Sequence, residues 1–228
     1  MKNSKTLQHP GTRRILPIAC ATALTMAFTV SLPQSAHAGH DVTPPPVPDN
    51  IQVEAGNKVF FVGHAEGTQN YICLPSDGGF KFTLFTPQAT LFNDDDKQVT
   101  THYFSPNLSP IPPEELNTIR ATWQHSRDTS TVWGEVKPGD SSSDPDFVAP
   151  GAIAWLLVTV VGAQDGPTGG DKLSKTTFIQ RMNTIGGVAP STGCSSETDV
   201  GTQAFVPYKA DYFFYKKATE RDADYGKW

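Results

Sequence analysis

Long apolar segments, basic residues and cysteines are all scarce in this chain of 228 residues. Beyond residue 38 no apolar run approaches the roughly 20 residues that a transmembrane helix needs, so no transmembrane segment is expected in the mature chain. The 23 acidic residues outnumber the 18 basic ones. Nucleic acids and anionic membranes bind basic faces, so neither is an expected partner.

Signature motifs of several enzyme classes are also missing. There is no Gly-x-Gly-x-x-Gly, whose glycines let backbone amides approach a dinucleotide pyrophosphate, so a nicotinamide-dependent dehydrogenase is excluded. There is no Gly-x-Ser-x-Gly elbow of a serine hydrolase. Neither His-x-His nor His-Glu-x-x-His, the spacings of zinc ligands, occurs. We therefore expect no cofactor and no metal, and we favour a protein without catalytic activity.

The first 38 residues have the composition of a removable leader. Basic residues between Lys2 and Arg14 precede an apolar run over 15–30, and Ala36-His37-Ala38 has the small-x-small pattern that signal peptidase accepts. We predict a signal peptide at 1–38 and export to the periplasm or the extracellular space. Removal takes away four of the 18 basic and none of the 23 acidic residues, which leaves 14 against 23 and a formal charge of −9.

Two cysteines, Cys73 and Cys194, remain after leader removal, because Cys20 lies within the leader. Export delivers them to an oxidising compartment, where thiols pair. We predict one disulfide, which would contribute roughly 2–4 kcal/mol by closing a long loop. The alternative is two separate buried thiols.

Short β-rich runs separated by turn residues fill the rest of the chain. They predict an all-β, single-domain sandwich or barrel of about nine strands with long Pro/Gly/Ser-rich loops. Residues 65–67, with Gly67, are expected to form a hairpin connection, and 137–150 a surface loop. The strands are expected at 58–64, 68–74, 80–86, 99–104, 122–125, 131–136, 153–161, 175–183 and 206–215.

Segments at both ends differ from this domain in composition. Residues 39–52 are rich in proline, which donates no backbone hydrogen bond, and are predicted to be an extended arm. The β-rich domain is expected at 53–216. Residues 217–228 are predicted to be a charged tail.

Candidate catalytic residues are His102, His125 and Asp128. A carboxylate beside an imidazole can fix its tautomer in an acid–base pair. The alternative, which we favour, is that these histidines lie at strand ends and only form hydrogen bonds with their neighbours.

Candidate binding residues are Arg181, Trp123 and Trp133. A guanidinium can hold a carboxylate or phosphate with two parallel hydrogen bonds. The alternative for Arg181, which we favour, is a buried ion pair with Asp211 or Asp128. Trp123 and Trp133 flank a loop and offer faces for stacking on sugars or other flat ligands, whereas Trp155 is expected in the interior.

Several motifs, taken together, resemble a family of exported bacterial and fungal proteins classed as a domain of unknown function. The resemblance covers about 53–215 and rests on segments 69–73, 101–103, 123–132, 152–157, 180–194 and 206–215. Some fungal members are labelled malate dehydrogenase-like, and membership implies no established activity. Where the family is expected to have Asp-Gly-Ser, this chain has Asp128-Thr129-Ser130.

Two classes of function follow from the sequence. The first is an exported, non-catalytic protein that binds a small molecule, a glycan or an envelope partner, or that stabilises the envelope or matrix. The second is a secreted hydrolase or metal-assisted enzyme with its site near His102, His125 and Asp128. A concave pocket that gathers these side chains would favour the enzyme.

Overall fold

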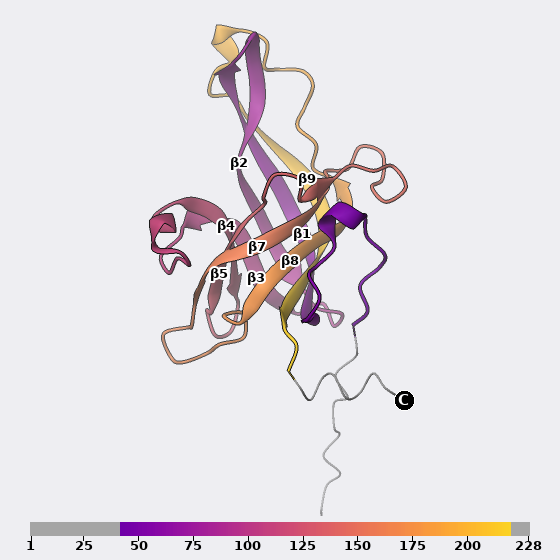
Figure 1. The fold of residues 1–228 in the computed structure, drawn as a ribbon. Coiled ribbons are helices and arrows are strands. Elements are labelled where there is room, and N and C mark those ends of the chain that lie inside the picture. Colours follow the sequence, from indigo (N-terminus) through magenta and orange to yellow (C-terminus); the bar gives the residue numbers. More distant parts are fainter. Residues whose placement is uncertain (1–41, 220–228) are drawn as a thin grey trace, which may run out of the picture. The chain divides into compact units, whose positions relative to one another are not determined.

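A computed structural model describes residues 42–219 of the chain, so the predicted leader and most of the predicted tail lie outside the described residues. All strands of this part run antiparallel to their neighbours (Figure 1). The strands are β1 (Asn57–Ser76), β2 (Gly79–Phe92), β3 (Gln98–Pro106), β4 (Ile119–His125), β5 (Thr131–Glu135), β6 (Ser141–Ser142), β7 (Trp155–Gln164), β8 (Thr176–Gly186) and β9 (Gln203–Lys217).

Eight of these strands close into a barrel. The sheet order is β5-β4-β3-β2-β1-β9-β8-β7-β6, and a further pairing of β5 with β7 joins the two sides of the sheet. The short β6 pairs with the start of β7 outside this ring. An eight-stranded barrel is just wide enough for side chains to fill it or for one small ligand. Of the two folds that the sequence allowed, the structure is the barrel.

The predicted hairpin at 65–67 is wrong, because β1 runs without a break through this segment. Gly67 pairs with Ala89 of β2 on one side and with Tyr208 of β9 on the other. A Cβ atom at Gly67 would lie 2.1 Å from the Gln88 carbonyl oxygen. The glycine therefore permits a close approach of two strands in the barrel wall. It does not form a turn.

Side chains alternate between the inside and the outside of the barrel, as a strand period of two requires. The inner faces of β1 and β2 carry small residues beside large ones from elsewhere in the wall. Trp123, Tyr212 and Phe214 fill much of the interior and are each at most 1 % exposed. Other members of this inner core are Ala65, Ala89, Leu91, Val132, Val158, Leu173, Ile179, Tyr208 and Ala210.

A second core lies on the outer face of β7, β8 and β9, under the Pro-rich arm. The arm ends in a 3-10 helix (Asp49–Ile51) whose Ile51 is fully buried. The Ile51 carbonyl accepts a hydrogen bond of 2.7 Å from Gln180 Nε2 of β8. The arm therefore packs on the barrel wall and covers apolar residues that would otherwise face solvent. They are Trp155, Leu157, Met182, Phe213 and Tyr215, with Val148 of the 137–150 loop.

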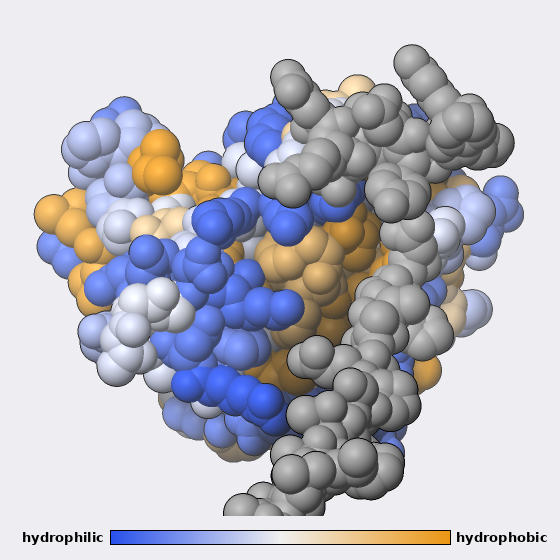
Figure 2. Space-filling model, turned by 90° about the horizontal axis from the view of Figure 1, so that it is seen from below, coloured by the Kyte–Doolittle hydropathy of each residue, from blue (hydrophilic) through white to orange (hydrophobic). Residues whose placement is uncertain are grey.

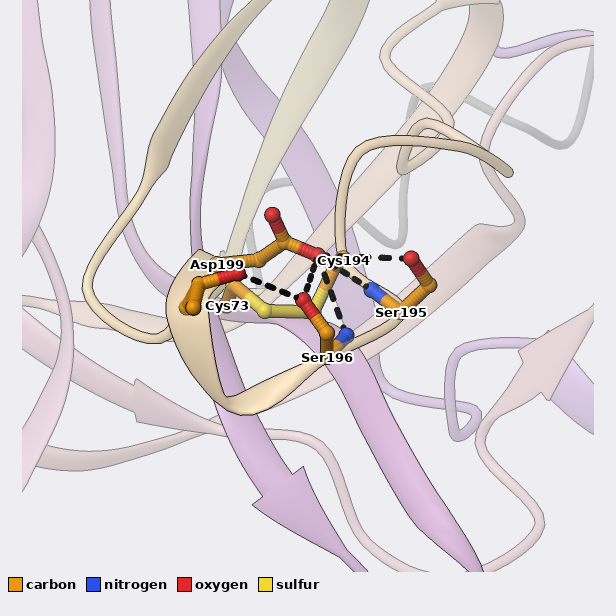
Figure 3. Close-up of a disulfide and its surroundings, with 6 residues drawn as sticks. Cys73, Cys194, Ser195, Ser196 and Asp199 are labelled. Atoms are coloured by element: carbon orange, nitrogen blue, oxygen red, sulfur yellow. Dashed lines mark hydrogen bonds between the residues drawn. A yellow bond between two sulfur atoms is a disulfide. The ribbon is translucent and has the colours of Figure 1, made fainter.

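The predicted disulfide is present and ties the segment after β8 to β1, near the tip of the β1–β2 hairpin (Figure 3). The Cα atoms of Cys73 and Cys194 are 5.5 Å apart. Beside the bridge, the Asp199 carboxylate accepts hydrogen bonds from the backbone of Ser195 and Ser196 (Figure 3). The segment between β8 and β9 is therefore held by a covalent bond and by a local hydrogen-bonded turn.

Within residues 42–219, no helix is long and apolar enough to span a bilayer.

Candidate functional site

A cavity of about 160 Å³, partly open to solvent, lies among side chains from most of the barrel strands. Leu84 and Val136, which are 37 % and 39 % exposed, border it on the solvent side. An apolar cavity of about this volume holds a molecule of the size of benzene. The full lining is Gln69, Leu84, Pro87, His102, Phe104, Ala121, Trp123, Val136, Leu156, Val158, Arg181 and Tyr212.

His102 lies in the cavity wall with its ring flat against Trp123. The two residues are register partners on β3 and β4, and their ring centroids are 4.2 Å apart. His102 Nδ1 donates to the Thr122 carbonyl at 2.9 Å, so Nε2 carries the free lone pair. Burial and the nearby Arg181 charge lower the pKa of His102 to about 3. The imidazole is therefore neutral at any physiological pH.

Arg181 projects from β8 into the same cavity. Its Nε and one terminal nitrogen donate to the Ala154 carbonyl at 3.2 and 2.8 Å. Among the described residues no carboxylate lies within ion-pair distance of the guanidinium, so the predicted ion pair with Asp211 or Asp128 is wrong. The reason is strand alternation, because β8 and β9 turn Arg181 inward while Asp211 faces outward to His64 and Asn183.

Two buried donors of the lining lack partners. Gln69 Nε2 and Trp123 Nε1 make no hydrogen bond, although the two side chains are only 2 % and 1 % exposed. The Gln69 amide lies near the Tyr208 hydroxyl, but without hydrogen-bond geometry. A buried donor without a partner costs about 1–3 kcal/mol, so such groups are uncommon and call for an explanation.

Buried tyrosines surround the guanidinium. Tyr212 is the register partner of Arg181 on β9, and its hydroxyl lies 3.3 Å from that of Tyr208. Burial raises the pKa of both tyrosines, and for Tyr212 the Arg181 charge opposes that rise. Tyr71, whose pKa is also raised by burial, donates to the Gly187 carbonyl. All three hydroxyls stay neutral, so none can balance the Arg181 charge.

The other two candidate catalytic residues lie outside this cavity, where β4 turns into β5. His125 Nδ1 and Asp128 Oδ1 are 2.9 Å apart. The Asp128 carboxylate also accepts hydrogen bonds from the backbone and hydroxyl of Ser130 and from the backbone of Lys172. The Ser130 hydroxyl in turn accepts from the backbone of Leu173. The structure thus brings His125 and Asp128 together, but it does not bring His102 to them.

This arrangement closes a turn and offers no reactive group. The Ser130 hydroxyl donates a hydrogen bond to the Asp128 carboxylate and accepts one from the Leu173 amide, so both of these contacts serve the turn. Thr129, at the position where the family is expected to have glycine, has a left-handed φ of 57°. Its amide donates to the His125 carbonyl at 3.0 Å. Hydrogen bonds therefore hold a tight turn that glycine would adopt without strain.

Comparison with known proteins identifies the family. Residues 54–216 match the profile of a protein family of unknown function, DUF3455. The chain belongs to the DUF3455 family. The match begins just before β1 and ends inside β9, so it spans every strand of the barrel. Neither the curated proteins nor the solved structures gave a match.

The lowered pKa of Asp128 predicts that the unfolding free energy of this DUF3455 barrel depends on pH in the acid range. Burial alone would raise its pKa, but the hydrogen bonds from Ser130, Lys172 and His125 prevail and lower it to about 2. A carboxyl group whose pKa is lower in the folded state stabilises the fold at pH values above its pKa in the unfolded chain. This stabilisation is lost as the pH falls through its pKa in the folded chain. We expect Asp128→Asn to cost about 2 kcal/mol at pH 7, and the difference from the native chain to shrink between about pH 4 and pH 2.

Urea unfolding at a series of pH values measures this difference. Asp146→Asn is the matched control, because Asp146 is exposed and none of the hydrogen bonds found among residues 42–219 involves its carboxylate. An Asp128→Asn cost that stays constant down to pH 2 would contradict the role given to the ionised carboxylate.

The predicted aromatic binding face is not present on the surface. Trp133 is 3 % exposed, and its indole nitrogen donates to the Ser105 hydroxyl at 3.0 Å. Trp123 is buried inside the barrel, where it lines the cavity. Trp155 is buried as expected, but in the outer core, with Phe147 packed edge-on against it. Because the barrel is closed, the ring of Trp123 lies in the interior and not on the surface.

A second hollow, of about 570 Å³, lies at the opposite end of the barrel. Phe60, Phe61 and Val99 line it, and Arg127 and Lys172 stand at its edge. Figure 2 views the molecule from below, toward this end, and shows apolar surface beside hydrophilic residues. Lys172 lies 5.5 Å from the centre of the Phe61 ring, so its charge already has an aromatic partner.

Metal-binding geometry was not found in the described part of the chain, where no three His, Cys, Asp or Glu side chains gather around one point. His64 is the histidine with the most acidic contacts, since its two ring nitrogens lie 2.7 Å from Asp211 and 2.9 Å from Asp94. Burial opposes a raised pKa at His64, but these two carboxylates raise it above 6.5. The pair of contacts fastens the β2–β3 turn to β9.

Sequence reasoning missed Gln69 and Tyr212 as site residues. Both lie in strands that it predicted, on the side that alternation assigns to the interior. The available signal was the position of the polar Gln69 two residues before Tyr71, which places both side chains on the same face of the strand. Local sequence could not show that these side chains would meet Arg181.

Proposed function

We propose that this chain is an exported, non-catalytic protein that holds a small, mainly apolar molecule inside its barrel. The observation that carries the proposal is the cavity inside the barrel, whose largely apolar wall contains a guanidinium without a carboxylate and two buried donors without partners. Ligand sites typically combine an apolar wall with a few convergent polar groups. The leader-like sequence at 1–38 and the disulfide support the exported part of the proposal.

The alternative, a secreted hydrolase or metal-assisted enzyme, has less support. His102 faces the cavity, whereas His125 and Asp128 belong to a turn whose hydrogen bonds are used within the fold. A triad-type hydrolase needs a nucleophile, a base and a third group in mutual contact. His125 contacts Asp128, but no contact joins His102 to either of them in the described structure.

Binding of benzyl alcohol, a neutral molecule with one ring, tests the proposal. We expect saturable shifts of the Gln69 side-chain amide and the Trp123 indole proton in heteronuclear NMR spectra, because both groups line the cavity. Ala121→Leu fills the cavity and should abolish these shifts, since Ala121 is part of its wall. Ala55→Leu, at an exposed position before β1, is the matched control and should leave them unchanged. Equal binding to the Ala121→Leu and native chains, or no saturable binding at all, would refute the proposal.

A further inference from the structure

We infer that the molecule held in the barrel is a small monocarboxylic acid, bound as its anion, with the carboxylate on Arg181 and an apolar body of about one ring in the rest of the cavity. This inference rests on the proposed function, and it adds the charge and the chemical class of the ligand. It follows from the charge of the cavity, its donors and its size.

The cavity carries one net positive charge. Arg181 is the only basic residue among its lining residues, and no aspartate or glutamate lines it. His102 and the nearby tyrosines cannot change this balance, because all of them are neutral at physiological pH. An isolated charge in an apolar site is costly unless an opposite charge pairs with it. A ligand with a single negative charge would supply that missing partner.

The free donors fit a carboxylate. Arg181 uses two of its five N–H groups on the Ala154 carbonyl, and a further one can serve the neighbouring Tyr212 hydroxyl. Its planar fork can present the remaining N–H groups to a carboxylate. Gln69 Nε2 and Trp123 Nε1 add two buried donors that lack acceptors in the structure. A carboxylate is an acceptor only, with about four lone-pair positions, so one such group can satisfy several of these donors at once.

The size and polarity of the cavity exclude bulkier anions. A phosphate carries more charge and more oxygens than one guanidinium and two neutral donors can satisfy. A volume of about 160 Å³ also leaves no room for a sugar phosphate or a nucleotide beside the apolar wall of Leu84, Phe104 and Leu156. The flat faces of Trp123 and His102, stacked on each other in this wall, suit a planar or branched apolar body.

The direct test compares benzoate with benzamide, a neutral molecule of the same shape, on the native full-length exported chain by isothermal titration calorimetry at pH 7. We expect benzoate to bind at least about tenfold more tightly, because only the anion pairs with the partly buried Arg181 cation. The affinity should also change less than about threefold between low and high salt, since a pair held inside the cavity is screened less than one on the surface.

Arg181→Met should remove the preference for benzoate, and it should leave benzamide within about threefold of its native affinity. Arg127→Met is the matched control, because Arg127 is exposed at the second hollow and contributes the same charge to the chain. It should leave the preference intact. Loss of the preference in Arg127→Met, with the preference kept in Arg181→Met, would place the anion at the second hollow and overturn the inference.

The outcomes separate the two proposals. Equal affinity of the native chain for benzoate and benzamide would overturn the carboxylate inference and leave the barrel as a binding site for neutral molecules. Binding of neither probe, nor of benzyl alcohol, would overturn both. Because the comparison of benzoate with benzamide uses the native chain, its result does not depend on whether Arg181→Met folds.

Discussion

Replacing Trp123 by alanine should lower the free energy of unfolding by about 3–5 kcal/mol, the range for truncating a fully buried aromatic residue. The indole is 1 % exposed, lies flat on His102 at 4.2 Å, and meets Tyr212 and Phe214 edge-on. Its loss would enlarge the cavity that it borders, and the surrounding strands cannot collapse into the space because they form a closed ring. Urea unfolding followed by circular dichroism measures the change.

Phe205→Ala is the control for Trp123→Ala. Phe205 is 59 % exposed, so truncating it should change the unfolding free energy by less than about 0.5 kcal/mol. A cost below about 1 kcal/mol for Trp123→Ala would mean that the interior is not packed around the indole as described. Because domains of this kind are stable by only about 5–15 kcal/mol, the expected loss is a large part of the total.

Removing the disulfide by the double change Cys73→Ser and Cys194→Ser should cost about 2–4 kcal/mol. The two residues are 121 positions apart in the sequence, and the chain-entropy contribution of so long a loop has an upper value of about 5 kcal/mol. Two backbone hydrogen bonds lie beside the bridge, one from the Cys73 amide to the Thr202 carbonyl and one from the Gly201 amide to the Cys73 carbonyl. Urea unfolding of the native and double-variant chains, each with and without a reductant, measures the effect.

The position of the bridge predicts where its loss is felt. Hydrogen exchange should accelerate in the segment between β8 and β9 and near the tip of the β1–β2 hairpin, because the disulfide joins these two places (Figure 3). The barrel strands should keep their protection, since β5 closes on β7 without help from the bridge. The double variant should be insensitive to reductant. Uniform acceleration over all strands would show instead that the bridge holds the whole barrel.

Much of the strand content of this chain can be predicted from local sequence, and particular residues show why. In the run over 206–215, Tyr208, Ala210 and Tyr212 alternate with Lys209 and Asp211, and the structure buries the first set and leaves the second more exposed. Glycine was harder to interpret. Gly67 looks like a turn residue, but it is required where β1 approaches β2, and that contact is made only when the strands pair.

The candidate site was only partly predictable, for a similar reason. His125 and Asp128 are three residues apart, and their contact follows from a local turn. Arg181 was a candidate binding residue for which an ion pair was favoured, but the expected carboxylate partners face elsewhere. The position of Gln69 on the inward face of its strand was a signal, but the lack of a hydrogen-bond partner for its amide appears only once the barrel interior is formed.

The sequence by itself determined the all-β class, most of the strand positions and the pairing of Cys73 with Cys194. The strands follow from patterns among neighbouring residues, and two cysteines can form only one intramolecular disulfide. Only the tertiary structure decided that the sheet closes and that His102, Trp123, Arg181 and Tyr212 surround one cavity. These residues come from β3, β4, β8 and β9, and they meet because of register between strands far apart in the chain, which no local pattern encodes.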